Sequence, residues 1–372
     1  MDGQLAGPSD EQLAKLRDQF VCVRLIQMGG VDLATFQFDP FLSWSVFFMN
    51  ADKTIYGRFG RAHPQTKRNK KDSNPNHTPA GLKAAMSAAL KIHQDYMRDP
   101  EQWGTALAGK TGATPRWRFA EKTPAARRYK RLKRIDSGEK GCVHCHEVQR
   151  TAIDSYFMKR IALPDNMLWL YPRPAVLGLT MDNRHAARVS KVAPDSAAAQ
   201  AGVRVGDDIV SMSAQPLVSI ADIQWVLHTF PDKGGVIPIE VARAGKPVML
   251  SLELEDGWRR KEDFGWRYRV AGYSSWLWAG VSFRDSKQGV VVAQRAPRWF
   301  KRANEEPKRK LQPRDVIVEV DGKTGMDRSA LLAYLMRDKR LGSKVTFVVL
   351  RGGQRVPVEF RIPKKQPEVQ GY

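Results

Sequence analysis

Long apolar runs are missing from this sequence. No stretch approaches the ~20 apolar residues that a membrane-spanning helix requires, and the first eleven residues lack the basic start and apolar core of a secretory signal. The sequence also has no glycine-rich phosphate loop, no His-Glu-x-x-His zinc motif, and no Ser, His and Asp set at catalytic spacing. We therefore predict no membrane span, and the sequence offers no hydrolase or transferase constellation.

Acidic residues are scarce beside basic ones. The chain has 61 Lys and Arg against 39 Asp and Glu, a formal charge of +22. Such an excess attracts phosphate, acidic lipids or acidic proteins, and it keeps nucleic acid among the candidate partners. The basic residues gather between Lys110 and Arg134 and between Lys301 and Lys310, where no nucleic-acid-binding motif accompanies them. Because such runs are typical of linkers and surface loops, we do not expect nucleic acid to be the main partner.

The first hundred residues show a definite order of elements. The pattern predicts a helix over residues 11–19, a strand over Phe20–Ile26 with Cys22 buried on it, a hairpin over residues 44–59, and a helix capped by Thr78. The strand and hairpin sequences resemble a bacterial family of thioredoxin-like/PDZ (seleno)proteins. The resemblance implies a thioredoxin-like domain over residues 11–98.

This thioredoxin-like domain is expected to be incomplete. A thioredoxin fold opens with a strand and a helix that carries a redox cysteine pair, and neither is found ahead of Phe20. Disulfide exchange needs a second thiol, so we predict no oxidoreductase activity there. The domain is either degenerate or shortened by an internal start that also removed a signal peptide.

The clearest motif is Cys142-Val143-His144-Cys145-His146, which matches the Cys-x-x-Cys-His attachment sequence of c-type haem. Two thiols at this spacing each bond a haem vinyl group, and the adjacent imidazole binds the iron. We predict covalent haem c on Cys142 and Cys145, with His146 as proximal iron ligand, on a helix that runs to about Arg160. Met167 follows that helix and is the first choice for the distal ligand.

Other interpretations of the cysteine pair stay open. A plain redox dithiol also has this spacing, although the thioredoxin-like region ends some forty residues earlier. A zinc site would need a second distant ligand pair, which the sequence does not supply. Coincidence is the weakest alternative, because the chain has only 3 cysteines.

Residues 174–256 and 276–363 repeat one pattern. The first repeat carries Ala201-Gly202-Val203-Arg204-Val205-Gly206-Asp207-Asp208-Ile209-Val210 and the second Gln312-Pro313-Arg314-Asp315-Val316-Ile317. Both resemble bacterial PDZ domains of HtrA-type proteases. The alignment pairs Asp208 with Asp315, leaves no Gly before Asp315, and assigns an insertion to residues 300–310.

The PDZ resemblance implies binding of protein carboxyl termini or extended peptides, which add a strand beside a glycine-containing loop. Ile223, Trp225 and Val226 are expected to line the side-chain pocket of the first repeat, and the insertion is expected to weaken binding by the second. Either repeat could instead only pack against its neighbours. The predicted peptide-binding residues are Leu177, Gly178, Leu179 and Thr180 in the first repeat and Ala279, Gly280 and Val281 in the second.

Together these features predict an α+β multidomain chain. We predict a protein of the periplasm or cell envelope that binds proteins through its PDZ-like domains and uses haem c for electron transfer or redox sensing with a partner protein. The alternative is a PDZ scaffold or quality-control adaptor with a redox dithiol and no haem. The predicted segments are a thioredoxin-like domain (11–98), a basic linker (99–140), the Cys-x-x-Cys-His segment (141–173), the first PDZ-like domain (174–256), an aromatic and basic connector (257–275) that packs the repeats together, the second PDZ-like domain (276–363) and a tail (364–372).

Overall fold

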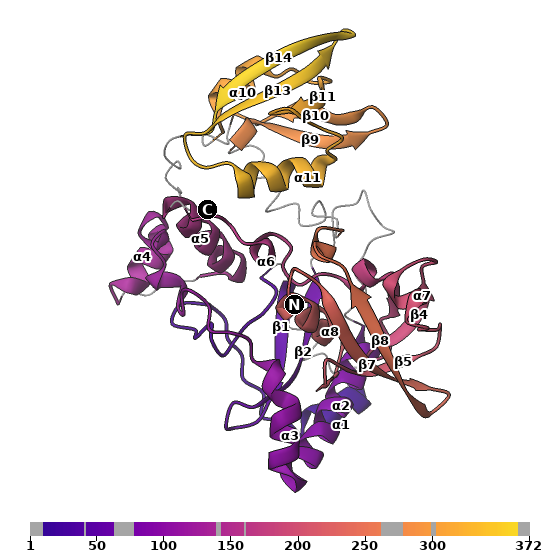
Figure 1. Ribbon diagram of the computed structural model, residues 1–372. Helices are drawn as coiled ribbons and strands as arrows, with labels where there is room; N and C mark the ends of the chain where they lie inside the picture. Colours follow the sequence, from indigo (N-terminus) through magenta and orange to yellow (C-terminus); the bar gives the residue numbers. More distant parts are fainter. Residues whose placement is uncertain are drawn as a thin grey trace. The chain divides into compact units, whose positions relative to one another are not determined.

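The computed structural model forms two compact units (Figure 1). The first unit comprises residues 1–26, 32–118 and 169–262, and the second comprises residues 27–31, 119–168 and 263–372. Each unit therefore holds one repeat together with part of the chain that precedes the repeats. The structure describes residues 10–40, 42–62, 78–138, 143–159, 161–261, 278–298 and 303–363. Among these residues, no helix is both long and apolar enough to cross a membrane.

The N-terminal part of the first unit, meaning the described residues within 10–26 and 32–118, is a hairpin with helices. The predicted hairpin is confirmed: β1 and β2 are antiparallel, with Val46 opposite Phe59. The predicted helix is also confirmed, because the Thr78 hydroxyl accepts the Gly81 N–H at 2.9 Å and caps α2. The buried face of α2 packs on the hairpin. The elements are α1 (Glu11–Arg17), β1 (Leu42–Met49), β2 (Ile55–Ala62), α2 (Pro79–Arg98), α3 (Pro100–Leu107) and η2 (Ala108–Lys110).

The predicted strand over residues 20–26 is wrong. Val21 and Val23 are 95% and 81% exposed, and Cys22, expected to be buried, is exposed. An alternating apolar run forms a strand only where a neighbouring edge offers backbone partners, and in the described residues β1 and β2 pair only with each other. The described residues therefore show a two-stranded hairpin with helices and no thioredoxin-like sheet.

The first repeat is a sheet with the strand order β3-β4-β5-β7-β8, and β6 pairs with β5. Its core is apolar and includes the inner face of α8. Trp258, from the predicted connector, belongs to this core, and its indole N–H donates to the Pro231 carbonyl at 2.8 Å. The elements are η5 (Pro174–Leu177), β3 (Leu179–Asp182), β4 (Arg188–Val192), α7 (Ala197–Gln200), β5 (Asp208–Met212), β6 (Gln215–Pro216), α8 (Ile220–Thr229), β7 (Gly235–Arg243), β8 (Lys246–Leu254) and η6 (Trp258–Lys261).

The second repeat has the corresponding strand order β9-β10-β11-β13-β14, and β12 pairs with β11. The mixed helix and sheet content of both repeats confirms the α+β class. Outside the described residues lie the connector aromatics Trp266, Tyr268 and Tyr273, the following Trp276, and the tail 364–372. The elements are β9 (Val281–Ser286), β10 (Gly289–Arg295), α10 (Glu305–Lys310), β11 (Val316–Val320), β12 (Lys323–Thr324), α11 (Arg328–Ala333), η8 (Tyr334–Asp338), β13 (Lys344–Arg351) and β14 (Gln354–Arg361).

The segment expected to be a basic linker carries secondary structure. Its second half packs on α5 in the second unit: the Tyr129 hydroxyl donates to Asp154 at 2.6 Å, and the Ala125 N–H donates to the Ser155 hydroxyl at 3.0 Å. Polar groups on both sides of this contact are buried and paired, so residues 119–138 are part of a folded layer. The elements are η3 (Ala120–Lys122), η4 (Ala126–Arg128), α4 (Lys130–Asp136), α5 (Cys145–Met158) and α6 (Asp165–Leu168).

Candidate peptide-binding sites

The glycine loop of the first repeat has the geometry that requires glycine. Gly178 ends η5 with a φ of +85°, where a residue with a Cβ is strained. A Cβ at this position would also overlap the Ser196 side chain. The loop already uses two of its N–H donors, because Val176 donates to Arg173 at 3.0 Å and Gly178 donates to Ala175 at 2.9 Å. A terminal carboxylate would compete for donors that the loop itself employs.

An unpaired strand edge follows this loop. In the described residues β3 pairs with β4 and with no other strand. The Gly178 carbonyl accepts the Ala193 N–H at 2.8 Å. Backbone groups along an antiparallel strand face alternately toward and away from the neighbouring strand, so the N–H and C=O of Leu179 face the open edge. Thr180 is exposed, whereas the side chains of Leu177 and Leu179 lie in the core. The first repeat therefore offers backbone, and not these leucine side chains, to a peptide.

Helix α8 lies beside this sheet but does not present the predicted pocket. Ile223 and Val226 point into the core of the repeat. Trp225 is buried on another face, where its indole N–H donates to the Gly109 carbonyl at 2.8 Å. In the first unit, α8 also packs against β2 (Figure 1). The N-terminal part thus covers a face of α8 that sequence reasoning had assigned to ligand.

A buried ion pair joins α8 to the N-terminal part. The Lys110 ammonium lies 3.0 Å from a carboxylate oxygen of Asp222, and both side chains are 0% exposed. The Asp222 carboxylate also accepts the N–H groups of Val218 at 2.9 Å and Arg58 at 3.2 Å. Burial lowers the pKa of the Lys110 ammonium, and the neighbouring carboxylate opposes that shift. Sequence reasoning missed this pair, since 112 positions separate its two members.

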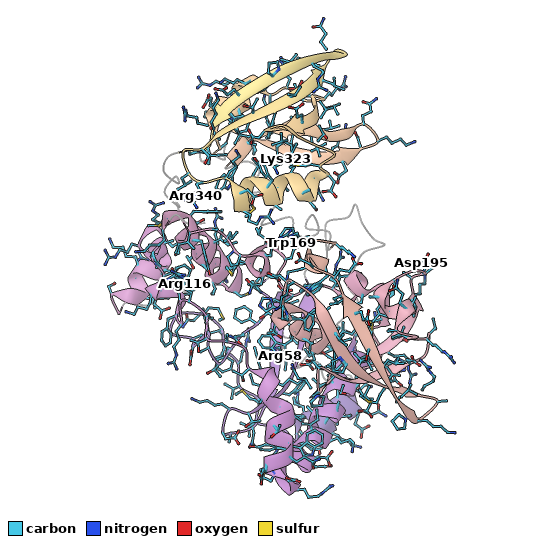
Figure 2. All side chains as sticks on the ribbon, viewed as in Figure 1. Arg58, Arg116, Trp169, Asp195, Lys323 and Arg340 are labelled. Carbon is cyan, nitrogen blue, oxygen red and sulfur yellow. The ribbon has the colours of Figure 1, made fainter. Side chains whose placement is uncertain are left out.

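Arg58 is the second buried cation of this contact. Its guanidinium carbon lies 3.8 Å from the centroid of the Trp225 ring, and Nη2 donates to the Lys110 carbonyl at 2.6 Å. Figure 2 shows Arg58 in the interior of the first unit. Burial lowers the pKa of Arg58 to about 10, which still leaves the guanidinium charged near neutral pH. Cation–π contact with a desolvated Trp is strongest in such a position.

The second repeat reproduces the loop and edge of the first. Gly280 has a φ of +66°, and its carbonyl accepts the Ala296 N–H at 2.8 Å. The Val281 backbone therefore faces the edge of β9 that pairs with no other strand among the described residues, while the Ala279 and Val281 side chains are buried. A Cβ at Gly280 would overlap the Asn304 carbonyl. The predicted residues Ala279, Gly280 and Val281 thus lie together at one loop and strand start.

The alignment between the repeats needs a correction of one residue. Arg243 binds Asp207 through two nitrogens in the first repeat, and Arg351 binds Asp315 in the same way in the second. Asp207, and not Asp208, is therefore the counterpart of Asp315. The glycine counterpart that seemed to be missing is Arg314, which adopts a φ of +77° where Gly206 has +91°.

The insertion in the second repeat is also smaller than predicted. Ala193 and Ala296 make the same bond to the glycine loop, and Ser196 and Asn304 cap the next helices, α7 and α10. Two residues separate the first pair, and seven residues, 297–303, separate the second. Helix α10 is therefore the counterpart of α7, and the insertion adds five residues to the preceding loop.

The structure locates part of the Cys-x-x-Cys-His motif. The predicted helix is confirmed as α5, which begins at Cys145, and the Cys145 side chain is half-buried. Cys142 and the side chain of His146 lie outside the described residues. The Met167 carbonyl accepts a hydrogen bond from Gln149 at 3.3 Å, so the chain returns to α5 at that point. A helix start of this kind suits a haem attachment site and a dithiol equally, so haem c remains a prediction.

Comparison with known proteins bears on the repeats. The family model of the PDZ domain matches residues 175–254 and 279–362, so the chain contains two PDZ domains. The chain is 31% identical over 120 residues to the periplasmic serine endoprotease DegP of Salmonella typhimurium, covering 31% of this chain and 23% of that protein. It is 26% identical over 188 residues to a probable periplasmic DegP-like endoprotease of Pseudomonas putida, covering 49% and 39%.

A solved structure, the serine endoprotease from Yersinia pestis, matches 21% of this chain and 29% of its own chain at 30% identity, with a TM-score of 0.19. The chain thus spans less than a quarter of the DegP protein from Salmonella typhimurium and well under half of the Pseudomonas putida relative.

Proposed function

We propose that this chain is a cell-envelope adaptor that binds proteins through exposed carboxyl termini or extended segments, mainly at its first PDZ domain. The observation that carries the proposal is the open edge of β3 beside the Gly178 loop, where Leu179 offers a backbone N–H and C=O. Adding a strand at such an edge is how PDZ domains bind peptides. The periplasmic location named for the relatives supports an envelope location.

The test measures peptide binding to the full chain. Dye-labelled hexapeptides with free carboxyl termini are titrated by fluorescence anisotropy. Each peptide that binds is then compared with an amidated form and with a form N-methylated at the amide expected to pair with the Leu179 carbonyl. Edge pairing predicts that N-methylation weakens binding at least tenfold, because it removes the donor and adds bulk. Equal affinity of the methylated and unmethylated peptides would show that binding does not use the β3 edge.

The test modifies the peptide and leaves the Gly178 loop unchanged, for a reason that lies in the loop geometry. Gly178→Trp is unsuitable, because the positive φ and the overlap with Ser196 would disturb the fold as well as the site. Modifying the peptide backbone leaves the protein unchanged and avoids that ambiguity.

This adaptor role needs no haem. A visible absorption spectrum of the exported chain, recorded before and after denaturation, tests the haem prediction separately. An absorption band that survives denaturation, and that Cys145→Ala weakens, would add electron transfer to peptide binding. A colourless exported chain in which Cys142 and Cys145 cycle between dithiol and disulfide would favour the adaptor with a redox dithiol.

A further inference from the structure

Tyr171 lies against α8 in an unusual conformation. Its ring stacks on the His228 imidazole with the centroids 4.1 Å apart and an angle of 17°. Gln224 donates from Nε2 to the Tyr171 carbonyl at 3.0 Å. The Tyr171 side chain is buried, and its φ is +43°, which is rare for a residue with a bulky side chain. Specific contacts therefore hold this residue in a backbone conformation that it does not favour.

Tyr171 covers a third face of α8. The core of the repeat contacts the face that contains Ile223, and the N-terminal part contacts the face that contains Trp225. Tyr171 contacts Gln224 and His228. A peptide paired with β3 projects alternate side chains to one side of its backbone. Those that point toward α8 would need a face that the chain itself already occupies.

We propose that Tyr171 is an intrachain plug of the first PDZ domain, and that a bound peptide displaces it from α8. This inference rests on the proposed peptide-binding function. The positive φ of Tyr171 is an unfavourable backbone conformation for a residue with a bulky side chain, so the released form is less unfavourable than the buried contacts alone suggest. The apparent affinity for peptide is then the intrinsic affinity multiplied by the fraction of molecules in which the plug is released.

The N-terminal part of the unit supports the plug through Trp225. The Tyr171 and Trp225 rings have centroids 6.3 Å apart, and with Leu170 they form one buried cluster. Arg58 lies over the Trp225 ring, 3.8 Å from its centroid. The N-terminal part of the unit therefore contacts the buried cluster to which Tyr171 belongs.

The test compares three full-length chains: the wild type, Tyr171→Gly and Tyr171→Phe. Glycine accepts the positive φ without strain and removes the ring, so this variant removes the plug without adding backbone strain. Phenylalanine keeps the ring and serves as the matched control. With the same pool of dye-labelled hexapeptides, we expect about tenfold tighter binding to Tyr171→Gly than to the wild type, and unchanged binding to Tyr171→Phe.

A second measurement follows the plug directly. The stacked Tyr171 ring should shift the NMR signals of the His228 ring protons, and Tyr171→Gly should remove that shift. Adding the tightest-binding hexapeptide to the wild-type chain should move the His228 signals toward their positions in Tyr171→Gly.

The outcomes separate this inference from the function on which it rests. Equal peptide affinity of the wild type and Tyr171→Gly, or peptide binding that leaves the His228 signals in place, would show that Tyr171 is no plug, with peptide binding intact. If no hexapeptide binds either chain, although the His228 signals show that Tyr171→Gly has exposed α8, then the proposed function fails and the plug fails with it.

Discussion

The two PDZ domains share a framework but differ on one helix. Both have the glycine loop, the open edge strand and the bidentate Arg–Asp pair, and the helices α8 and α11 are capped by Ser219 and Asp327 at corresponding positions. Three and six residues after these caps, the first domain has Asp222 and Trp225, whereas the second has alanines. The N-terminal part packs on the first domain through these two side chains. The shared loop, edge strand and Arg–Asp pair therefore belong to the PDZ fold, whereas the side chains on the surface of α8 determine that the N-terminal part packs on the first domain.

The largest loss of stability should come from replacing Asp222, whose position in the second domain is occupied by an alanine. Asp222→Ala leaves the buried Lys110 charge without its partner and removes an acceptor from the Val218 and Arg58 N–H groups. Loss of one partner of a buried ion pair costs about 3–5 kcal/mol. We expect hydrogen–deuterium exchange under increasing urea to show this loss for peptides of α8 and β2.

The matched control for this variant is Ala330→Ser at the corresponding position of α11. Ala330 is exposed, so the change should cost only about 0.5 kcal/mol through helix propensity. Similar losses in both helices would contradict the view that α8 carries a specialised contact.

Replacing a feature that both domains share should lower the stability of each domain by the same amount. Asp207 and Asp315 are 1% and 2% exposed and bind Arg243 and Arg351 through paired hydrogen bonds. Asp207→Asn and Asp315→Asn should each lower the free energy of unfolding of their own domain by about 2 kcal/mol, since charge-assisted bonds are lost. Exchange measured separately over β7 and β13 checks this. A difference above about 1 kcal/mol would show that the frameworks are not equivalent.

The pair of Asp207 and Arg243 predicts that the stability of the first domain depends on pH. The hydrogen bonds from Arg243 lower the pKa of Asp207 below its usual value in the folded state. A carboxylate whose pKa is lowered by folding stabilises the domain above its unfolded pKa, near 4, and loses that contribution as the pH falls through the folded value. Asp207→Asn should therefore flatten the acid limb of the stability curve of the first domain. If the acid limb is unchanged in Asp207→Asn, the loss of stability at low pH comes from another group.

The smallest effect concerns one backbone position. Gly206 and Arg314 occupy corresponding sites with φ values of +91° and +77°. No atom lies within 4 Å of a Cβ built on Gly206, so a substitution there acts on backbone strain alone. Gly206→Ala should destabilise the first domain by about 1 kcal/mol, and Arg314→Gly should stabilise the second by about 0.5 kcal/mol. Thermal unfolding curves check both signs, and a stabilising Gly206→Ala would contradict the assignment.

Local patterns in the sequence determined the parts whose partners lie close along the chain. The hairpin of β1 and β2, the cap of α2 at Thr78, the helix after Cys145 and the Gly178 and Gly280 loops were all predictable, because turns, caps and periodicity act over a few residues. The repeated pattern was also sufficient to identify two PDZ domains.

Tertiary structure decided what depends on distant partners. Residues 20–26 have the composition of a strand but do not form one, because no strand edge in the described residues pairs with them. In the sequence, Lys110 is one charge in a basic run and no pattern singled out Asp222, yet the fold buries the two side chains together. Tyr171 carried no sequence signal, since its stacking on His228 depends on a contact 57 positions away. Such contacts form only when the whole unit folds, so local patterns in the sequence do not reveal them.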